Sequence, residues 1–568
     1  MRGSTRGGSW PAPHLPGLDR LRHYQRRWLR ADVAAGLTVG AMLIPQSMAY
    51  AELAGLAPEV GFYAVIGALV VYALAGSSRH LGVGPEPGTA ILAGTGIASV
   101  AGGDADRYVA LMAALALVVA AICVIAALLR LGFLAAILSK PVLVGYITGV
   151  GLTLLSSQFG SFTGVPIGAD TFFPRCRELA TSLGEVHGPT LALGAGTLAL
   201  MLALRRFAPR APGALIGVVA ASAVVAVLGL DEEGIAVVGS IPGGLPVPGL
   251  PEVSLADLGR LVPLAAGVAL VGYTDNVLTA RSIAARHGYR IDPNQELWAL
   301  GFTNLSAGLS RGFPVSSSAS RTAVAASLGS ATQLVSLIAS AFVVVALLGL
   351  RPLLAEIPRA ALAAVIVVAA IAIIDLPGYR ALWRVSREEA VLAVAAALGV
   401  MIFGVLTGVL IAVGLSLVVA LHRIARPHDA VLGDHPALDG WVDVDAYPDA
   451  VPEPGLLVYR FDAPLFFLNA DRFRDRVEQA LAENPGVEDW LVLDCEGIGA
   501  LDASALDTLA DLVGGVARHG VAVVGVARAT EDVLAGLERA RLLEPAGPLR
   551  VFPTINGAVR AYRRQRRP

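Results

Sequence analysis

The sequence predicts a polytopic α-helical membrane domain followed by a smaller soluble domain of the α/β class. Only 15% of its 568 residues are charged and 55% are hydrophobic, whereas a soluble chain carries about 25% charged residues. Apolar stretches follow one another from about residue 31 to residue 424. Many of them approach the roughly 20 residues that a helix needs to cross a bilayer. From about residue 455 to residue 566 the pattern becomes charged and soluble.

The membrane domain divides into full spans and shorter, interrupted segments. We predict clear spans at 33–53, 60–76, 108–129, 133–156, 190–204, 212–230, 258–280, 330–350, 359–375 and 388–422. The last stretch is too long for one crossing and has Gly404 near its middle, so it counts as two. Shorter, broken segments lie at 87–100, 296–310 and 315–328, which brings the total close to fourteen.

Arginines set the expected orientation. Residues 1–30 contain seven arginines and a single acid, and no apolar core with a cleavage site follows them, so this segment is not a secretory signal. Arginine-rich loops stay on the cytoplasmic side, and an even number of crossings places both termini there, in a protein of the cell membrane. We expect a basic N-terminus at 1–30, a transmembrane domain at 31–425, a linker at 426–454 and a soluble domain at 455–568.

Composition also excludes several classes of function. The 43 basic and 45 acidic residues leave a net charge of −2, so the chain lacks the basic footprint of a nucleic-acid-binding protein. Its histidines are scattered, its three cysteines have no disulfide or metal-type spacing, and the serine run at 316–318 has no nearby histidine base. We expect neither an enzyme nor a bound cofactor.

Two interrupted segments point to a binding site. Residues 80–96 read HLGVGPEPGTAILAGTG and residues 312–329 read GFPVSSSASRTAVAASLG, each an extended stretch, then Gly or Pro, then a helix too short to span. Open backbone at membrane depth is tolerated only inside protein or at a wet cavity, and paired half-helices mark the midplane site of transporters. Their N-termini favour anions. The alternative is a pair of re-entrant loops without a ligand.

Intramembrane polar side chains accompany these half-helices. In the first span, Pro45 interrupts the helix and is followed by Gln46 and Tyr50. Asp275 and Thr279 lie one helical turn apart on one helix face. A carboxylate inside a membrane is costly, and it indicates a functional role such as binding a small cation or carrying a proton. The alternative for Asp275 is a structural ion pair with a nearby arginine, Arg281 or Arg321.

Two further charged residues lie at the half-helices themselves. Glu86 stands between two prolines just before the first half-helix, where it could cap that helix, carry a proton or repel an anion, and we favour capping. Arg321 lies in the first turn of the second half-helix. It is a candidate counter-charge for an anion. The alternative is a bridge to Asp275 or to a backbone carbonyl.

Four linked motifs resemble the sulfate permease (SulP) anion transporters, the bacterial relatives of prestin and pendrin. They are PQSMAYAELAG (45–55), SRHLGVGPEPGTA (78–90), TARSIAARHGYRIDPNQEL (279–297) and PVSSSASRTAV (314–324). The resemblance covers almost the whole chain after about residue 30. It implies a uracil-permease-like fold of fourteen segments in two inverted repeats of seven, with core and gate domains, elevator-like movement and a homodimer.

The resemblance also implies site residues by position. The substrate-binding set would be Gln46, Tyr50, Glu86, Thr89, Ser318, Ala319, Ser320 and Arg321. Asp275 and Thr279 match a sodium site of bicarbonate-carrying members, whereas many relatives with Glu at the Asp275 position are proton-coupled or uncoupled. Glu86 departs from the family, in which many members carry a hydroxyl or apolar residue there, and this departure raises the expectation of proton coupling.

The C-terminal residues show a different pattern. Apolar runs at 455–461, 489–495 and 521–526 predict buried strands, and amphipathic helices are expected at 470–484 and 501–513. The second helix begins with Asp502 or Ser504 in capping range. This domain resembles the STAS domain that SulP transporters carry. In signalling relatives a serine at about Ser504 is phosphorylated, whereas here we favour a helix-start role, and a cytosolic partner remains an expectation.

The sequence therefore predicts a secondary transporter of a small inorganic anion, of the bicarbonate or sulfate class, embedded in the lipid bilayer. Sodium or protons are the expected coupling ions, and alternating access is the expected mechanism. Three alternatives remain open: an uncoupled anion channel of the same fold, a dicarboxylate transporter, and a membrane-tethered regulatory module acting through its STAS-like part.

Overall fold

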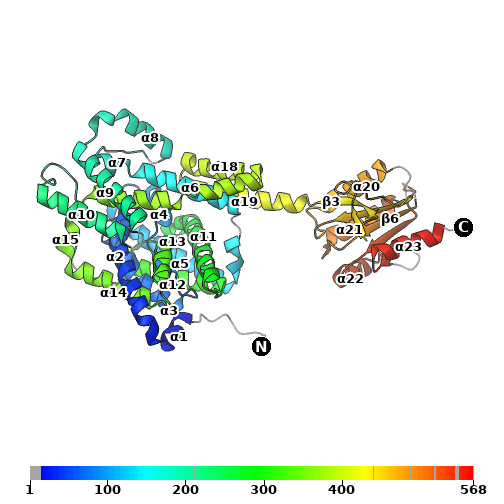
Figure 1. Ribbon diagram of the computed structural model, residues 1–568, viewed down its shortest axis with the longest axis horizontal. Coiled ribbons are helices and arrows are strands. Elements are labelled where there is room, and N and C mark those ends of the chain that lie inside the picture. Colours follow the sequence, from blue (N-terminus) through cyan, green and yellow to red (C-terminus); the bar gives the residue numbers. More distant parts are fainter. Residues whose placement is uncertain are drawn as a thin grey trace. The chain divides into compact units, whose positions relative to one another are not determined.

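The computed structural model describes residues 15–566 apart from 137–138, 170, 209–210, 243, 439, 485–488, 517–519 and 544–548. Two of the N-terminal arginines, Arg2 and Arg6, lie outside the described residues. The chain forms two compact units that divide near Ser416 (Figure 1), one built of helices and one built around a β-sheet.

The helical unit contains the fourteen predicted segments. The first repeat comprises α2 (Leu29–Leu53), α3 (Val60–Ala75), α4 (Pro87–Ala101), α5 (Ala105–Leu128), α6 (Lys140–Ser157), α9 (Gly188–Phe207) and α10 (Gly213–Leu228). The second repeat comprises α11 (Leu255–Arg286), α12 (Pro293–Leu309), α13 (Ala319–Ser327), α14 (Leu334–Gly349), α16 (Arg359–Ile373), α18 (Arg387–Phe403) and α19 (Val405–Ala425). Six helical stretches of the described chain are long and apolar enough to cross a membrane by length and composition.

Local sequence explains two of the helix boundaries. Gly404 separates α18 from α19 and has a φ of 84°, a left-handed conformation that glycine adopts without strain, so the predicted division into two helices is confirmed. Helix α6 begins at Lys140 rather than at 133, because Pro141 occupies its first turn and the preceding residues form a 3₁₀ helix, η2 (Leu131–Ala136).

Short connecting helices were not predicted. They are α1 (Pro16–Arg22), α7 (Phe159–Thr163), α8 (Phe172–Thr181), α15 (Arg351–Ala355), α17 (Leu376–Val385), and the 3₁₀ helices η1 (Arg26–Trp28) and η3 (Leu183–Glu185). They are short and lie between the long apolar runs, which is why the hydropathy pattern missed them.

Glycines allow the membrane helices to touch at their backbones. A Cβ atom at Gly61 of α3 would overlap the Ser47 carbonyl of α2, and one at Gly145 of α6 would overlap the Ala393 carbonyl of α18. Small residues at helix crossings permit this close approach in membrane proteins. Glycines at these two crossings therefore act as packing contacts.

The second unit is a six-stranded mixed sheet in the order β4-β3-β5-β6-β7-β8. Its strands are β3 (Asp429–His435), β4 (Gly440–Asp443), β5 (Leu456–Phe461), β6 (Trp490–Asp494), β7 (Val523–Ala527) and β8 (Leu549–Phe552). Strands β5 to β8 run parallel, whereas β3 is antiparallel to β4 and β5.

Helices cover both faces of this sheet. Buried residues of α20 (Ala470–Glu483), α21 (Ala503–Val516) and α22 (Glu531–Arg539) form one apolar cluster with one sheet face. Those of α23 (Ile555–Arg566) form a second cluster with the other face. Successive strand side chains point to opposite faces, so Leu457 lies in the first cluster and Leu456 in the second. The three predicted strands and the two predicted helices are all present.

The predicted linker at 426–454 differs from the structure. It contains β3 and β4, which extend the sheet by pairing with β5. Both strands are only partly buried, so they lack the continuous apolar run that identified the central strands.

Candidate functional site

The two interrupted segments of the membrane domain meet in the structure. Strand β1 (Gly82–Gly84) leads into α4, and strand β2 (Ser316–Ser318) leads into α13. The strands pair antiparallel, with Gly82 opposite Ser318 and Gly84 opposite Ser316. This pairing satisfies backbone groups that could not be left open at membrane depth. Because the strands are antiparallel and only three residues long, α4 and α13 leave opposite ends of one short ladder, and both helix N-termini lie next to it.

The N-terminus of α4 is already occupied by a carboxylate of the chain. The Thr89 backbone N–H donates to Glu86 Oε2 at 3.0 Å, and the Thr89 hydroxyl donates to the Glu86 carbonyl at 3.2 Å. The predicted capping by Glu86 is confirmed. A carboxylate at this position neutralises the partial positive charge of the helix end.

The N-terminus of α13 is more open. Ser318 caps this helix by accepting from the Arg321 backbone N–H at 3.5 Å, and its hydroxyl lies 3.1 Å from that of Ser320. Ala319 and Ser320 in the first turn are exposed. The first N–H groups of a helix have no partner within it, so this end can receive an acceptor from outside the chain.

Arg321 joins the two half-helices to the first span. It is 1% exposed. Its Nη1 donates to Gln46 Oε1 at 3.2 Å, and its Nη2 donates to the Pro85 carbonyl at 3.0 Å. Its Nε has no hydrogen-bond partner among the residues that the structure describes. The predicted bridge to a backbone carbonyl is therefore present, and the guanidinium is held in place with its Nε–H uncommitted.

Asp275 of α11 is bound to β2 by a serine that the sequence reasoning did not assign to the site. The Ser317 hydroxyl donates to Asp275 Oδ2 at 2.7 Å. Within the described residues, Asp275 forms no ion pair with either Arg281 or Arg321. Thr279 lies one turn further along α11 and is partly buried. The serine run at 316–318 indicates in the sequence that a hydroxyl could lie at the site. Only the structure shows that Ser317 is the serine that faces α11.

The charged groups of the site act on one another. Arg321 lies within electrostatic range of both Glu86 and Asp275, and the two carboxyl groups lie within range of each other. With both carboxyl groups ionised, one positive and two negative charges leave a net charge of −1 in a region of low dielectric constant.

A cavity of about 440 Å³ opens beside the α13 N-terminus. Gln46, Tyr50 and Ser320 line one side of it, so three of the predicted substrate residues share one hollow. Helices α9 and α16 line the other side, through Arg205 and apolar residues that include Val365. The sequence does not single out Arg205 as a site residue, because nothing in it shows which cavity a helix end faces.

Comparison with known proteins identifies the family. The model of the sulfate permease family matches residues 29–396, and the model of the STAS domain matches residues 447–558. The chain belongs to the sulfate permease family. This membership confirms the predicted resemblance and places the chain among multi-pass membrane transporters.

Relatives and solved structures of the sulfate permease family agree along nearly the whole chain. A probable sulfate transporter of Mycobacterium tuberculosis is 50% identical over 550 residues, covering 97% of this chain and 98% of that protein. Human solute carrier family 26 member 6 is 32% identical over 495 residues, covering 82% of this chain and 65% of that protein. The structure of SLC26A9 matches with a TM-score of 0.89 at 24% identity, covering 97% and 93% of the two chains, which confirms the fold.

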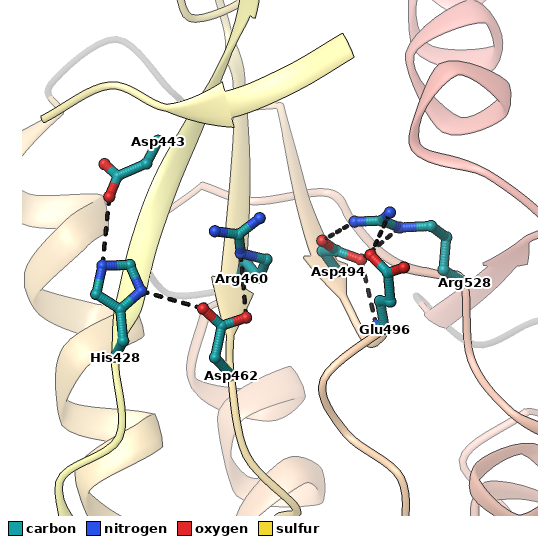
Figure 2. A network of polar contacts seen from close by, with 7 residues as sticks. All are labelled: His428, Asp443, Arg460, Asp462, Asp494, Glu496 and Arg528. Atoms are coloured by element: carbon teal, nitrogen blue, oxygen red, sulfur yellow. Dashed lines mark hydrogen bonds and ion pairs between the residues drawn. The ribbon is translucent and has the colours of Figure 1, made fainter. Parts of the chain in front are cut away.

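The STAS domain has its own charged cluster at the carboxyl ends of β5, β6 and β7. Figure 2 shows its members, which are His428, Asp443, Arg460, Asp462, Asp494, Glu496 and Arg528. Arg528 forms ion pairs with Asp494 and Glu496, and His428 lies 3.3 Å from Asp443 and 3.1 Å from Asp462. Arg528 donates to the Asp494 carboxylate, and this hydrogen bond raises the pKa of Arg528. These contacts pair the charges with one another and tie neighbouring strand ends together.

The predicted start of α21 is confirmed. Asp502 accepts from the Ala505 backbone N–H at 2.8 Å and so acts as the capping residue. Ser504 is exposed in the first turn, which is compatible with a helix-start role. Its modification stays a prediction.

Proposed function

We propose that this protein is a secondary active transporter of sulfate or a closely similar small anion. The observation that carries the proposal is the open N-terminus of α13 at the cavity, with a buried arginine directly behind it. In this arrangement the exposed first turn of α13 offers backbone N–H donors, and Gln46 and Tyr50 line the same hollow. Sulfate oxygens accept such hydrogen bonds, and a helix N-terminus favours negative charge.

Arg321 supplies the fixed positive charge for this site. Its bonds to Gln46 and to the Pro85 carbonyl hold the guanidinium next to both half-helix ends. An anion in the cavity would be attracted by this charge without needing to displace either bond. Replacement of Arg321 by alanine should weaken sulfate binding. An unchanged affinity for sulfate would mean that Arg321 serves only to bridge Gln46 and the Pro85 carbonyl.

We further propose that protons are the coupling ion, with Asp275 as the group that carries them. With both carboxyl groups ionised, Arg321, Glu86 and Asp275 carry a net charge of −1, and Arg205 across the cavity brings the sum to 0, so a divalent anion would leave the site at −2 in surroundings of low dielectric constant. Protonation of Asp275 and Glu86 reduces this repulsion and lets the loaded site move. A sodium ion held by Asp275 and Thr279 would serve the same end and is the alternative that the experiment separates.

The proposed movement is of the elevator type. The helices that carry the site, α2, α4, α11 and α13, form the core, and the helices α6, α9 and α16 that face them form the gate. Apolar side chains of α16, such as Val365 and Val368, face the site across the cavity, and a smooth apolar surface suits sliding. A homodimer and a cytosolic partner of the STAS domain remain predictions.

Uptake by proteoliposomes tests the function. Labelled sulfate, bicarbonate and a dicarboxylate are each offered with an imposed proton gradient, with a sodium gradient and with neither. We expect sulfate to accumulate with the proton gradient, and we expect D275N to lose this accumulation while D231N, in an exposed loop, keeps it. Accumulation driven by the sodium gradient would show that sodium, and not the proton, is the coupling ion. Flux without accumulation would indicate a channel. Gradient-driven uptake by D275N would remove Asp275 from the mechanism.

A further inference from the structure

A second cavity lies at the other end of helix α9 from the site described above. It has a volume of about 400 Å³, and its walls come from the chain around α7, the start of α9, the loop after α10 and the start of α16. The first cavity is lined by Arg205 near the end of α9, whereas this one is lined by Thr190 near its start. These two positions are about 22 Å apart along the helix. Because α9 is long enough to cross a membrane, the two cavities lie near opposite faces of the membrane domain.

The polar lining of this second cavity suits an anion. Its polar side chains are those of Arg359, His187, Thr190 and Ser161. Among the described residues that line it there is no aspartate or glutamate, and the acidic residues of the neighbouring loop at 231–233 are exposed and do not line it. A guanidinium and hydroxyl groups donate hydrogen bonds to the oxygens of an oxyanion. A hollow lined by charge of one sign also raises the local concentration of ions of the opposite sign.

Backbone hydrogen bonds hold the polar walls of the second cavity in place. The Arg359 N–H donates to the Ala236 carbonyl at 2.9 Å, and the His187 N–H donates to the Thr163 carbonyl at 2.9 Å. The Nδ1 atom of the His187 ring lies 2.7 Å from the Thr190 hydroxyl, which fixes the ring against α9. The cavity is therefore preformed, and a preformed site loses less conformational freedom when a ligand binds.

Arg359 also joins the proposed gate to the proposed core. Its Nε lies 3.6 Å from Oε1 of Glu52, in an ion pair between the first residue of α16 and the last turn of α2. Helix α2 is the core helix whose Gln46 and Tyr50 line the first cavity. Helices α2 and α16 pack against each other, and this ion pair connects them beside the second cavity. An anion in that cavity is a second negative partner for the same guanidinium.

We propose that the second cavity is an entry site for the transported anion, with Arg359 as its fixed positive charge. This assignment rests on the proposed function. The entry site binds an oxyanion such as sulfate at the membrane face opposite the first cavity, before the anion reaches the half-helices. The bound anion competes with Glu52 for Arg359 and so weakens the tie between α2 and α16. Occupancy of the entry site therefore favours opening of the transport site toward the face from which the anion arrives.

Two variants separate an entry site from a purely structural ion pair. R359Q and E52Q both break the ion pair, but only R359Q removes the positive charge that faces the cavity. We expect R359Q to raise KM for sulfate about fivefold, near the upper effect of an exposed charge pair, and E52Q to lower KM, because a competing carboxylate is removed. KM is measured from each membrane face separately, in intact cells and in everted membrane vesicles. The two opposite changes should appear at one face only.

Ionic strength gives a second readout for R359Q. The side chain of Arg359 is 52% exposed, so salt in solution screens its attraction for an anion. The difference in KM between R359Q and the wild type should shrink as ionic strength rises from about 0.01 M to about 1 M, over which the Debye length falls from about 30 Å to about 3 Å. A difference that does not change with ionic strength would contradict a role of this charge in attracting the anion.

R351Q is the matched control. Arg351 lies in the connection between α14 and α16 and does not line the second cavity. R351Q removes the same charge as R359Q and should keep the wild-type KM at both faces. Changes of KM in the same direction for R359Q and E52Q, or no change in either variant, would overturn the entry site alone. A wild-type protein that transports sulfate from neither face would overturn the proposed function together with it.

Discussion

Glu296 of α12 gives the strongest prediction about the stability of the membrane domain. Its side chain is fully buried at 0% exposed. Ser77 donates to Oε1 through its backbone N–H at 3.0 Å and its hydroxyl at 2.6 Å, and the Ser78 N–H donates at 3.2 Å. Tyr72 and Asn276 donate to Oε2, each at 2.9 Å. One carboxylate therefore joins α3, α11, α12 and the segment before β1.

The size of the effect follows from these five donors. E296A leaves all five without their acceptor, and at about 1 kcal/mol or more for each stranded group the loss reaches about 5 kcal/mol. That is comparable with the whole stability of many domains. E296Q keeps one acceptor oxygen for the Ser77 and Ser78 donors. Its amide N–H₂ can donate to the Tyr72 hydroxyl oxygen and to the Asn276 amide oxygen once these two groups rotate. We therefore expect E296Q to lose only about 1–2 kcal/mol of unfolding free energy.

Thermal unfolding of the purified protein in detergent measures this order. We expect E296A to unfold at a much lower temperature than E296Q, and E296Q slightly below the wild type. The same change at an exposed loop residue, E232Q, is the control and should have no effect. Equal unfolding temperatures for E296A and E296Q would contradict the reasoning, because the number of stranded donors would then not determine the stability.

Three further predictions concern packing and charge. G61A should destabilise the protein by about 3 kcal/mol in thermal unfolding, because the added methyl overlaps the backbone of α2. G259A is the control and should be neutral, because nothing lies within contact distance of that position. Equal unfolding temperatures for G61A and G259A would count against close helix packing at Gly61. D494N should speed hydrogen exchange in β6 and β7 of the full-length protein, because the ion pair of this fully buried side chain is lost, and unchanged exchange would contradict this. The hydrogen bond from Arg563 of α23 lowers the pKa of Glu453. The stabilisation of α23 by this pair is therefore complete above the ordinary carboxyl pKa of about 4.3 and is lost as pH falls through the lower pKa of the folded state. Hydrogen exchange in α23, compared between pH 7 and pH 3, should show this loss in the wild type and not in E453Q.

Local features of the sequence were sufficient for the helices and for part of the site. Gly404 and the Gly/Pro-rich starts of the half-helices interrupt long apolar runs, and each interruption appears in the structure at its predicted place. The capping by Glu86 also follows from local sequence, because a carboxylate before Pro87 stands within reach of the first N–H groups of the helix. Such features depend on neighbours a few residues away.

Partners across the fold could not be predicted in the same way. Arg321 bonds to Gln46, 275 positions away, and the sequence gives no reason to choose this amide over a carboxylate. The contact of Ser317 with Asp275 and the lining of the cavity by Arg205 depend equally on how distant helices pack. Strands β3 and β4 were missed because their partial burial leaves only a weak apolar pattern.

The most direct test of an anion site at the paired half-helices is to locate a bound anion. Selenate resembles sulfate in shape and charge, and its selenium atom scatters anomalously, so crystals of the protein grown with selenate would mark its position. We expect one selenium peak within hydrogen-bond reach of the first turn of α13, beside Gln46 and Tyr50. A peak confined to another part of the molecule, or an empty cavity at saturating selenate, would contradict the account.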